Sequence, residues 1–508
     1  MNTHGTKFQM FFLASTLGIC INAIPAFAET TEVVLNLNQK VSMKELAKSV
    51  TDPSSPRYRK FYTPAEIKQL VGPSDSAYQA LLNQLSSSGI QVVSESATHL
   101  SLTVRGERSV LTGIQTQLRS SLFQASALSQ VGSVHGLSPS KKRRPHLNFV
   151  SPLVTKDGTL PAQIKQDYDL NPIYTSGVSG KGQHIAIATY DGFNIQDVRD
   201  YYTKNGLSPG PTVDQVIFNG TPTYDPGSAA ETQVDAEFSG MIAPGATIHV
   251  FASAQNSDTG ELQVFTAILD DNRAKIANYS WGMCETDVAA DHKTAMDLLF
   301  ARAVAQGVNI TVASGDSGSD CKGDGSTVAD YPAANPNVVA VGGTSLTDVN
   351  GVGSETAWSG SGGGISSVYA KPAYQSGLGS AVFARRSYPD VAFNADSQTG
   401  QPAWIHYDPS NPSVAPANAQ YVVIGGTSIA APQWAGFLAL VGEARGAGKP
   451  LGYLNPTIYA IPDADMNKYF NDVTSGSNGA YTAAQGFDAV TGLGSMKGSP
   501  LLTYLKNN

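Results

Sequence analysis

Short apolar runs recur between residues 184 and 426, and helical patterns separate several of them. Nearly continuous apolar strands that alternate with helices are typical of a parallel sheet covered on both faces. The sequence therefore predicts an α/β fold, whose ligands bind beyond the carboxyl ends of the strands. The runs are HIAIATY (184–190), ATIHVFAS (246–253), KIANYSW (275–281), VNITVAS (308–314), VVAVGG (338–343) and YVVIGG (421–426).

The N-terminal part has a different pattern. Residues 30–137 read as a strand, three helices, an alternating hairpin and a last helix, which predicts a separate two-layer α+β unit. The second of these helices has a Thr63 N-cap, Pro64 at its first position and Glu66 three residues after the cap. We place the domain boundaries at 29–160 and 161–508.

Residues 1–28 resemble a secretory signal peptide. Lys7 precedes an apolar stretch, and Ala26-Phe27-Ala28 forms a cleavage site. A membrane anchor is the alternative, but Asn22 and Pro25 interrupt the stretch and no second span follows. We expect a secreted protein with no membrane association after cleavage, with the periplasm as a second possible destination.

Charge is unevenly distributed between the two parts. Residues 29–164 carry 15 Lys and Arg against 9 Asp and Glu, whereas residues 165–508 carry 17 against 32. Opposite charges attract at neutral pH, and this attraction fades below about pH 4 as carboxylates protonate. Acid release of a paired N-terminal part is one interpretation, and ordinary compositional drift is the other. The basic run at 141–144 indicates a cleavable linker rather than a nucleic-acid site.

Chemically active residue types follow the predicted strands. Ser428 lies between YVVIGG and an apolar helix, where the helix N-terminus favours developing negative charge. Asp316 follows VNITVAS, and Glu231 and Asp235 share one helical face. Singly, each has an ordinary structural role, as an N-cap, a turn residue or helix-dipole partners. Together they place a serine and three carboxyl groups at one sheet edge.

A serine nucleophile needs a base. In a subtilisin-type enzyme that base is a histidine, and the C-terminal part contains only four. None lies in an HGT-like setting, so a carboxylate is the expected base. These histidines are His184, His249, His292 and His406.

Taken with their order, several strings resemble the sedolisin family, the serine-carboxyl peptidases. They are GGTSIAAP (425–432), E231-x-x-x-D235, GMIAPGA (240–246), SWG (280–282), SGDSG (314–318), YPAANPNVVAVGGTSL (331–346), TAWSGSGGGISS (356–367), RRSYPDVAFNADSQTG (385–400), FNDVTSGSNG (470–479) and GFDAVTGLGS (486–495). Residues 52–74 resemble the activation propeptide of that family. The resemblance implies a subtilisin-like sheet preceded by a propeptide domain.

On matching positions, the resemblance implies that Ser428 is the nucleophile and Glu231 its general base. Asp235 supports that glutamate, and a protonated Asp316 completes the oxyanion hole. Glu231 must be ionised while Asp316 is protonated, and both states coexist most readily in acid, because carboxyl groups titrate near about pH 4.

The remaining predicted sites depend on the same resemblance or on context. The C-terminal strings resemble the family's site for one structural Ca²⁺, formed by oxygen donors. Trp281 and the loop with Ser359, Gly362 and Gly363 are expected to line the substrate cleft. Cys284 and Cys321 remain after export to an oxidising compartment and are expected to pair. The calcium ligands implied are the Asp472 and Asp488 carboxylates and the main-chain carbonyls of Val473, Ala484 and Gly486.

One position departs from the family pattern. Some members extend the carboxylate chain with a glutamate in the first strand of the catalytic domain, and Thr189 stands there instead. We expect the relay to end at Asp235.

The sequence thus predicts a secreted, acid-active endopeptidase, monomeric when mature, whose propeptide is an intramolecular inhibitor until it is removed autocatalytically. Its substrates would be proteins or peptides. One alternative is a tripeptidyl-peptidase of the same family. The other is a catalytically inactive, calcium-binding secreted protein.

Overall fold

The structure is a computed structural model that describes residues 29–118, 120, 124–149, 158–207, 210–349, 352–379, 383–407 and 417–508. The predicted signal peptide, residues 1–28, lies outside the described residues. Within the described part, no helix combines the length and apolarity needed to cross a bilayer.

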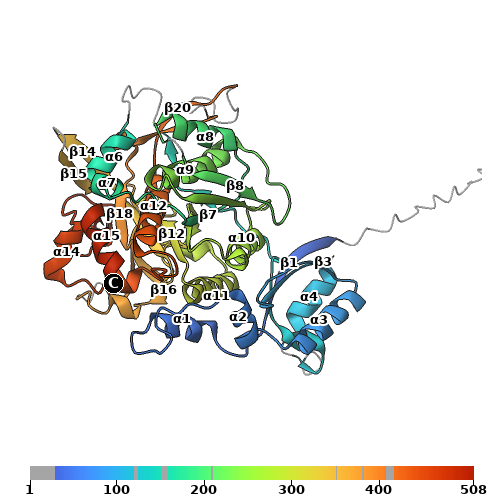
Figure 1. Cartoon of the computed structure of the whole chain (residues 1–508). Helices are drawn as coiled ribbons and strands as arrows, with labels where there is room; N and C mark the ends of the chain where they lie inside the picture. The colour runs from blue at the N-terminus through green and yellow to red at the C-terminus, as the bar shows by residue number, and fades with distance from the viewer. Residues whose placement is uncertain are drawn as a thin grey trace, which may run out of the picture.

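The N-terminal lobe is the two-layer α+β unit that the sequence predicts (Figure 1). Its antiparallel sheet has the order β2-β3-β1-β4, and helices α3 and α4 pack on one face around Leu35, Leu81 and Leu102. The bounds are β1 (Thr30–Leu37), α3 (Asp75–Ser87), β2 (Gln91–Glu95), β3 (Ser101–Glu107), α4 (Arg108–Gln117), η1 (Ala127–Gln130) and β4 (Val131–His135).

Two helices of the N-terminal part leave this lobe and pack on the larger body. Helix α1 (Met43–Thr51) lies beside α11 (Ala290–Gln306) (Figure 1). Its Leu46 and Val50 are buried in the same apolar cluster as Ala301 and Val304 of α11. Helix α2 (Pro64–Leu70) begins with the capping box that the sequence predicts. Ile67 of α2 belongs to the same apolar cluster as α1 and α11, so both helices contact the body.

The larger body is built on a ten-stranded sheet whose central strands are parallel, as predicted. Its order is β21-β22-β18-β14-β12-β10-β7-β9-β8, with β15 paired to β14. The bounds are β7 (His184–Thr189), β8 (Thr212–Val216), β9 (Thr247–Ala252), β10 (Ile276–Tyr279), β12 (Asn309–Ala313), β14 (Val339–Val349), β15 (Val352–Ala357), β18 (Val391–Asn394), β21 (Phe470–Asn471) and β22 (Ser495–Met496).

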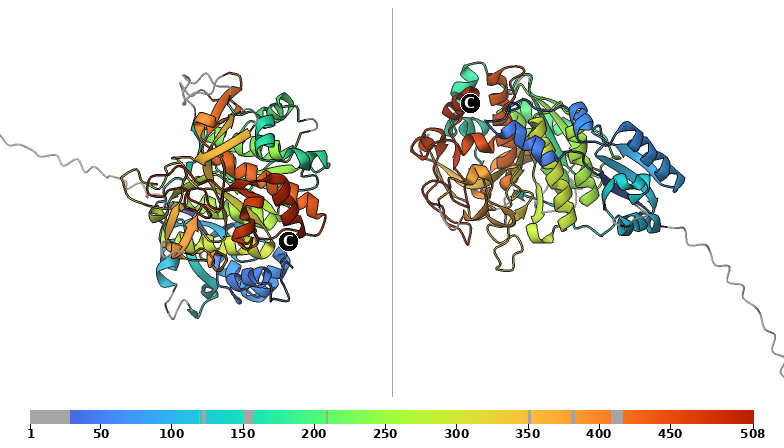
Figure 2. Two further views of the ribbon diagram at one scale, coloured as in Figure 1. Left: turned by 90° about the vertical axis from the view of Figure 1, so that its left-hand side faces the viewer. Right: turned by 90° about the horizontal axis from the view of Figure 1, so that it is seen from below.

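Helices cover both faces of this sheet (Figure 2). Along β7, Ile185 and Ile187 join the apolar cluster that contains α9 and α12, while Ala186 and Ala188 join the cluster of α10 and α11. Both faces are buried, which is why the strands read as continuous apolar runs. The bounds are α8 (Ile195–Lys204), α9 (Pro226–Ile242), α10 (Asp258–Asp271) and α12 (Thr427–Arg445).

One strand prediction is wrong in its partner. The run YVVIGG forms β20 (Gln420–Gly425), which pairs antiparallel with β19 (Gln401–Ile405) and lies outside the parallel sheet. A polypeptide that returns directly from β19 forms an antiparallel pair without the helical crossover that a parallel pair requires. Strand β20 still leads directly into α12.

Shorter elements complete the described fold. They are β5 (Arg144–Pro145), β6 (Asn148–Phe149), α6 (Pro161–Asp167), α7 (Asn171–Thr175), β11 (Trp281–Cys284), η2 (Glu285–Asp287), β13 (Asp330–Tyr331), β16 (Gly364–Ala370), η3 (Ala373–Gln375), β17 (Arg385–Tyr388), η5 (Ser397–Thr399), α13 (Asn455–Ile458), α14 (Asp463–Tyr469) and α15 (Gly498–Asn507).

The docking of α1 predicts the effect of a propeptide substitution. Leu46→Ala removes a buried side chain and leaves a cavity, so it should lower the free energy of unfolding of the full chain by about 2–4 kcal/mol. Urea denaturation at neutral pH in a Ser428→Ala background measures this. Lys44→Ala, at an exposed position of the same helix, should change the free energy of unfolding by less than about 0.5 kcal/mol. Equal effects of the two substitutions would contradict the packing described.

Candidate active site

Ser428 lies in the first turn of α12, fully buried, and its hydroxyl faces α9. Its Oγ donates a hydrogen bond to Glu231 Oε2 at 2.9 Å. Gly426 enters the helix with φ of 105°, in the left-handed region that favours glycine. A Cβ on Gly426 would lie 2.3 Å from the carbonyl oxygen of His146, so this turn accepts no side chain.

Glu231 and Asp235 lie one turn apart on α9, and both are fully buried. Asp235 Oδ1 accepts a hydrogen bond from Ser280 Oγ at 2.7 Å. Burial raises the pKa of both carboxyl groups well above their usual range, and the proximity of Asp235 raises that of Glu231 further. The second oxygens of the two carboxyl groups, Glu231 Oε1 and Asp235 Oδ2, are buried and have no hydrogen-bond partner among the described residues. The pair is thus suited to retain a proton.

Asp316 follows β12 in the turn predicted from SGDSG. Its Oδ1 accepts hydrogen bonds from the backbone N–H and the hydroxyl of Thr427, each at 2.8 Å. The residue is partly exposed, but its carboxyl group lies deep among protein atoms. Burial raises its pKa to about 6, although the charge of His146 and the hydrogen bonds from Thr427 oppose the shift. The carboxyl group is therefore protonated in mild acid.

The linker between propeptide and body passes through this site in an extended conformation. Strand β5 pairs antiparallel with β11, and β6 pairs antiparallel with β20. Between the two, the N–H of His146 donates to the carbonyl oxygen of Ser280 at 3.1 Å, and the N–H of Ser428 donates to the carbonyl oxygen of His146 at 3.0 Å. Asn148 Nδ2 donates to Asp316 Oδ2 at 2.7 Å. The linker thus occupies the cleft as an extended peptide ligand.

The side chain of His146 fills a buried pocket on the body. Its Nε2 lies 3.5 Å from Asp330 Oδ1, an ion-pair distance longer than a well-formed hydrogen bond. A Cβ on Gly282 would come within 2.4 Å of this nitrogen, so glycine makes room for the ring. Burial opposes protonation of His146, but Asp330 outweighs it and raises the pKa.

The histidines of the body have other partners. His184 Nδ1 lies 2.9 Å from His249 Nε2, and His249 Nδ1 lies 2.7 Å from Asp214 Oδ1. His292 contacts Glu261, and His406 contacts Asp197. Ser428 Oγ instead contacts Glu231, so the geometry favours a carboxylate as base.

Trp281 and Thr189 are neighbours. The indole of Trp281 is 1% exposed and donates from Nε1 to Thr189 Oγ1 at 3.1 Å, so only its backbone reaches the linker, opposite Pro145. The main chain of Trp281 thus borders the linker while its ring lies in the core, and the expectation that Trp281 lines the substrate cleft stays a prediction. Thr189 also bonds Thr232 at 2.8 Å. In the described structure, neither threonine extends the chain of carboxyl groups beyond Asp235.

The predicted cleft loop lies behind Asp316. The N–H of Gly362 donates to the carbonyl oxygen of Gly315 at 2.7 Å, and a Cβ on Gly363 would lie 2.2 Å from the carbonyl oxygen of Ala489. The carbonyl oxygen of Ser359 would lie 2.9 Å from a Cβ on Gly318. These residues support the turn that carries Asp316, and their binding of substrate stays a prediction.

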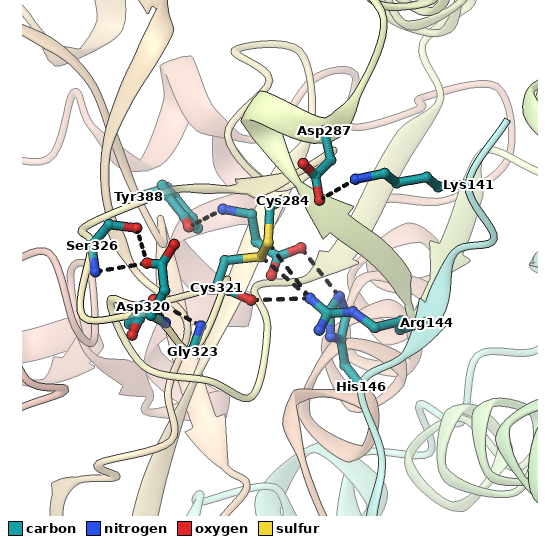
Figure 3. The surroundings of a disulfide bond; sticks show 12 residues. Lys141, Arg144, His146, Cys284, Asp287, Asp320, Cys321, Gly323, Ser326 and Tyr388 are labelled. Atoms are coloured by element: carbon teal, nitrogen blue, oxygen red, sulfur yellow. Dashed lines mark hydrogen bonds and ion pairs between the residues drawn. A yellow bond between two sulfur atoms is a disulfide. The ribbon is translucent and has the colours of Figure 1, made fainter.

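Cys284 and Cys321 form a disulfide beside the linker (Figure 3). Arg144 lies over it and donates to the carbonyl oxygen of Cys321 at 3.3 Å. Lys141 forms an ion pair with Asp287 at 3.1 Å on the same edge of the cleft. The disulfide thus joins two segments that border the linker.

The predicted calcium ligands lie together in one loop region. The carboxylate of Asp472 accepts from the N–H of Gly486 at 3.0 Å, and Asp488 Oδ2 accepts from the N–H of Ala484 at 3.2 Å. Both carboxylates thus lie against the main chain of residues 484–486, and oxygen donors of this kind suit Ca²⁺. The carbonyl ligands, that of Val473 included, stay a prediction. Among the described residues, no group of three or more His, Cys, Asp or Glu side chains is arranged to hold a metal ion.

Sequence analysis missed several residues of this site. Ser280 bridges Asp235 and the linker, and Asn278 donates to Ser280 Oγ at 3.0 Å. Ser280 is the first residue of the SWG string and Asn278 lies two residues before it, so that string was the available signal. His146 and Asn148 were recognisable only as part of a linker, because nothing in their sequence indicates where the linker runs.

Comparison with known proteins agrees with this geometry. Residues 224–457 match the model described as "Subtilase family", and residues 26–126 match "Pro-kumamolisin, activation domain". The chain is 34% identical to kumamolisin of Bacillus sp. (strain MN-32), covering 75% of this chain and 71% of that protein. It is 28% identical to sedolisin of Pseudomonas sp. (strain 101), covering 95% and 88%.

Rat (Rattus norvegicus) tripeptidyl-peptidase 1 is 27% identical, covering 92% of this chain and 89% of that protein. The structure of Pseudomonas sedolisin, a serine-carboxyl proteinase complexed with two molecules of pseudo-iodotyrostatin, superimposes with a TM-score of 0.61. It has 32% sequence identity and covers 70% of this chain and all of that one.

The fold and the site define a serine peptidase with a subtilisin-like body. The chain belongs to the sedolisin family of serine-carboxyl peptidases and carries an activation propeptide.

The raised pKa of Asp316 predicts a pH-dependent contribution to stability. The folded state binds this proton more tightly than the unfolded chain, whose carboxyl pKa is about 4. The resulting stabilisation is present below about pH 4 and is lost as the pH rises through about 6. In a Ser428→Ala background, the difference in unfolding free energy between Asp316 and Asp316→Asn should fall by up to about 3 kcal/mol between pH 4 and 7. A difference independent of pH would contradict the assignment.

Proposed function

We propose that the chain is a secreted, acid-active endopeptidase that is made as a proenzyme and cuts its own linker. The observation that carries the proposal is the pair of contacts at Ser428. Its hydroxyl donates to a carboxylate while its backbone N–H holds the carbonyl oxygen of a peptide lying through the cleft. This combination presents a serine oxygen, a base and a polarised carbonyl together.

In this mechanism, Ser428 Oγ attacks the carbonyl carbon of His146 while Glu231 takes the hydroxyl proton. The oxyanion is stabilised by the N–H of Ser428 and by the acid proton of Asp316, as in other oxyanion holes. Glu231 then gives its proton to the departing nitrogen of Leu147, the bond between His146 and Leu147 breaks, and water releases the acyl group by the reverse sequence.

Proton positions explain why acid is required. Glu231 acts as a base only when ionised, and a proton retained by Asp235 allows this, because it removes the second negative charge from the pair. Asp316 donates to the oxyanion only while it is protonated, below about pH 6. A histidine base would be charged under such conditions.

The propeptide acts as an intramolecular inhibitor in this proposal, because its linker occupies the cleft. Acidic groups on the body face basic linker residues, including Asp287 against Lys141 and Asp258 against Arg143. In the proposal, the general attraction between the acidic body and the basic N-terminal part fades below about pH 4, as carboxyl groups protonate. Acid would therefore both activate the site and loosen the inhibitor.

The cleft geometry favours an endopeptidase over a tripeptidyl-peptidase. Four linker residues, 143 to 146, lie on the N-terminal side of the attacked bond in contact with the body, and the chain continues beyond them. An enzyme that removes tripeptides needs a cleft that ends after three residues. An inactive binding protein is disfavoured because the serine and all three carboxyl groups are present in working contact.

Two further parts of the proposal concern calcium and export. Asp472, Asp488 and the carbonyls of Val473, Ala484 and Gly486 would hold one Ca²⁺, which supplies structural cross-linking of the C-terminal loops when bound. Export depends on the signal-like residues 1–28. The mature enzyme is expected to be a monomer.

Self-processing is directly testable. Residues 29–508 held at about pH 3.5 should lose the propeptide by cleavage between His146 and Leu147, because Asp316 is protonated there, and should remain intact at neutral pH. Mass spectrometry with time measures this. Ser428→Ala and Glu231→Gln should each slow cleavage by about 10³-fold or more. Processing of the Ser428→Ala chain at the natural rate would refute the proposed nucleophile.

Calcium binding can be tested without an activity assay. Chelation should lower the melting temperature of the Ser428→Ala chain by on the order of 5 °C, since an ion that binds only the folded state stabilises it. Asp488→Asn should abolish this response, whereas Asp465→Asn, at an exposed helix position, should preserve it. A melting temperature unaffected by chelation would count against the site.

A further inference from the structure

Arg143 of the linker fills a pocket of the body that the catalytic mechanism does not use. Its side chain is 1% exposed, and Nη2 lies 2.6 Å from Glu261 Oε2 and 2.7 Å from Asp258 Oδ1. Nε donates to the same oxygen of Glu261 at 3.1 Å, and His292 Nε2 lies 2.9 Å from Nη2. His292 Nε2 also lies 2.6 Å from Glu261 Oε2 and donates to that carboxylate, so the acceptors of the guanidinium are Glu261 and Asp258. A buried guanidinium is favourable only with charged acceptors of this kind.

These side chains belong to the body rather than to the propeptide. Glu261 and Asp258 are on α10, and His292 is on α11. Glu261 Oε1 also accepts from the hydroxyl of Tyr279 at 2.7 Å, and this hydroxyl lies 2.6 Å from that of Tyr190. Because packed residues fix the carboxylate independently of the linker, the pocket remains when the linker leaves.

The backbone of Arg143 is fixed separately from its side chain. Asn256 Oδ1 accepts from the N–H of Arg143 at 2.7 Å, and Asn256 Nδ2 donates to its carbonyl oxygen at 3.0 Å. These two hydrogen bonds involve only backbone atoms of Arg143, so they position the peptide without selecting a side chain. The side chain at this position is selected by the pocket that holds the guanidinium. By contrast, the neighbouring Arg144 is exposed.

We propose that Glu261, Asp258 and His292 form a specificity pocket for arginine, three residues before the residue whose carbonyl Ser428 attacks. This inference rests on the proposed function, and it identifies the preferred substrates as chains with arginine at that position. Although burial opposes ionisation, the charges of Arg143 and His292 lower the pKa of Glu261 to about 2. The pocket therefore keeps a negative group in acid while it holds an arginine.

The test uses enzyme obtained by acid processing of the full chain and peptides that copy residues 140–149. Replacing the arginine that corresponds to Arg143 by alanine should lower kcat/KM about 10- to 100-fold, since it removes several charged hydrogen bonds. A peptide with lysine at this position should have an intermediate kcat/KM, because lysine keeps the positive charge but lacks the planar guanidinium group of arginine. The matched control replaces the arginine that corresponds to Arg144 by alanine and should change kcat/KM less than about threefold.

A variant enzyme separates this pocket from a general effect of charge. Glu261→Gln should reduce the ratio of kcat/KM for the arginine peptide to that for the alanine peptide at least about fivefold. Equal losses from the two arginine replacements would overturn the inference while leaving the proposed peptidase intact. Failure of the processed enzyme to hydrolyse either casein or the parent peptide would instead overturn the proposed function, and the pocket with it.

Discussion

The site depends on how closely α9 and α12 approach each other. A Cβ on Gly436 of α12 would lie 2.6 Å from the carbonyl oxygen of Ser239 on α9, so the two backbones are separated by less than a side chain. This contact lets Glu231, one turn into α9, reach the hydroxyl of Ser428 at the start of α12. A larger residue at 436 would displace one helix and with it the hydrogen bond between nucleophile and base.

Burial then gives similar carboxyl groups different roles. Burial raises the pKa of both Glu231 and Asp235, and the charge of Asp235 raises that of Glu231 further. For Asp316, burial raises the pKa to about 6, even though its two hydrogen bonds from Thr427 oppose the shift. The same low-polarity surroundings strengthen each hydrogen bond made to the reacting carbonyl.

Much of this arrangement could be predicted from sequence. Apolar periodicity identified the parallel strands and the helices beside them. The ends of these strands correctly place Asp316, which follows β12, whereas Ser428 follows a strand outside that sheet and was paired with Asp316 by the family resemblance. Periodicity could not show that β20 pairs with β19, because a buried strand has the same apolar pattern in a parallel and in an antiparallel sheet. Nor could it place the Trp281 ring in the core or His146 at the serine, since both depend on contacts between segments distant in sequence.

The attachment of α1 and of the linker to the body has a consequence for timing. While the linker is intact, its local concentration at the cleft is set by covalent connection and does not change with dilution. Once a single bond is cut, the same surfaces hold the propeptide as an ordinary two-component complex, whose occupancy depends on total protein. An enzyme released into a large external volume would then lose its inhibitor by dilution, whereas one concentrated near its site of synthesis would retain it.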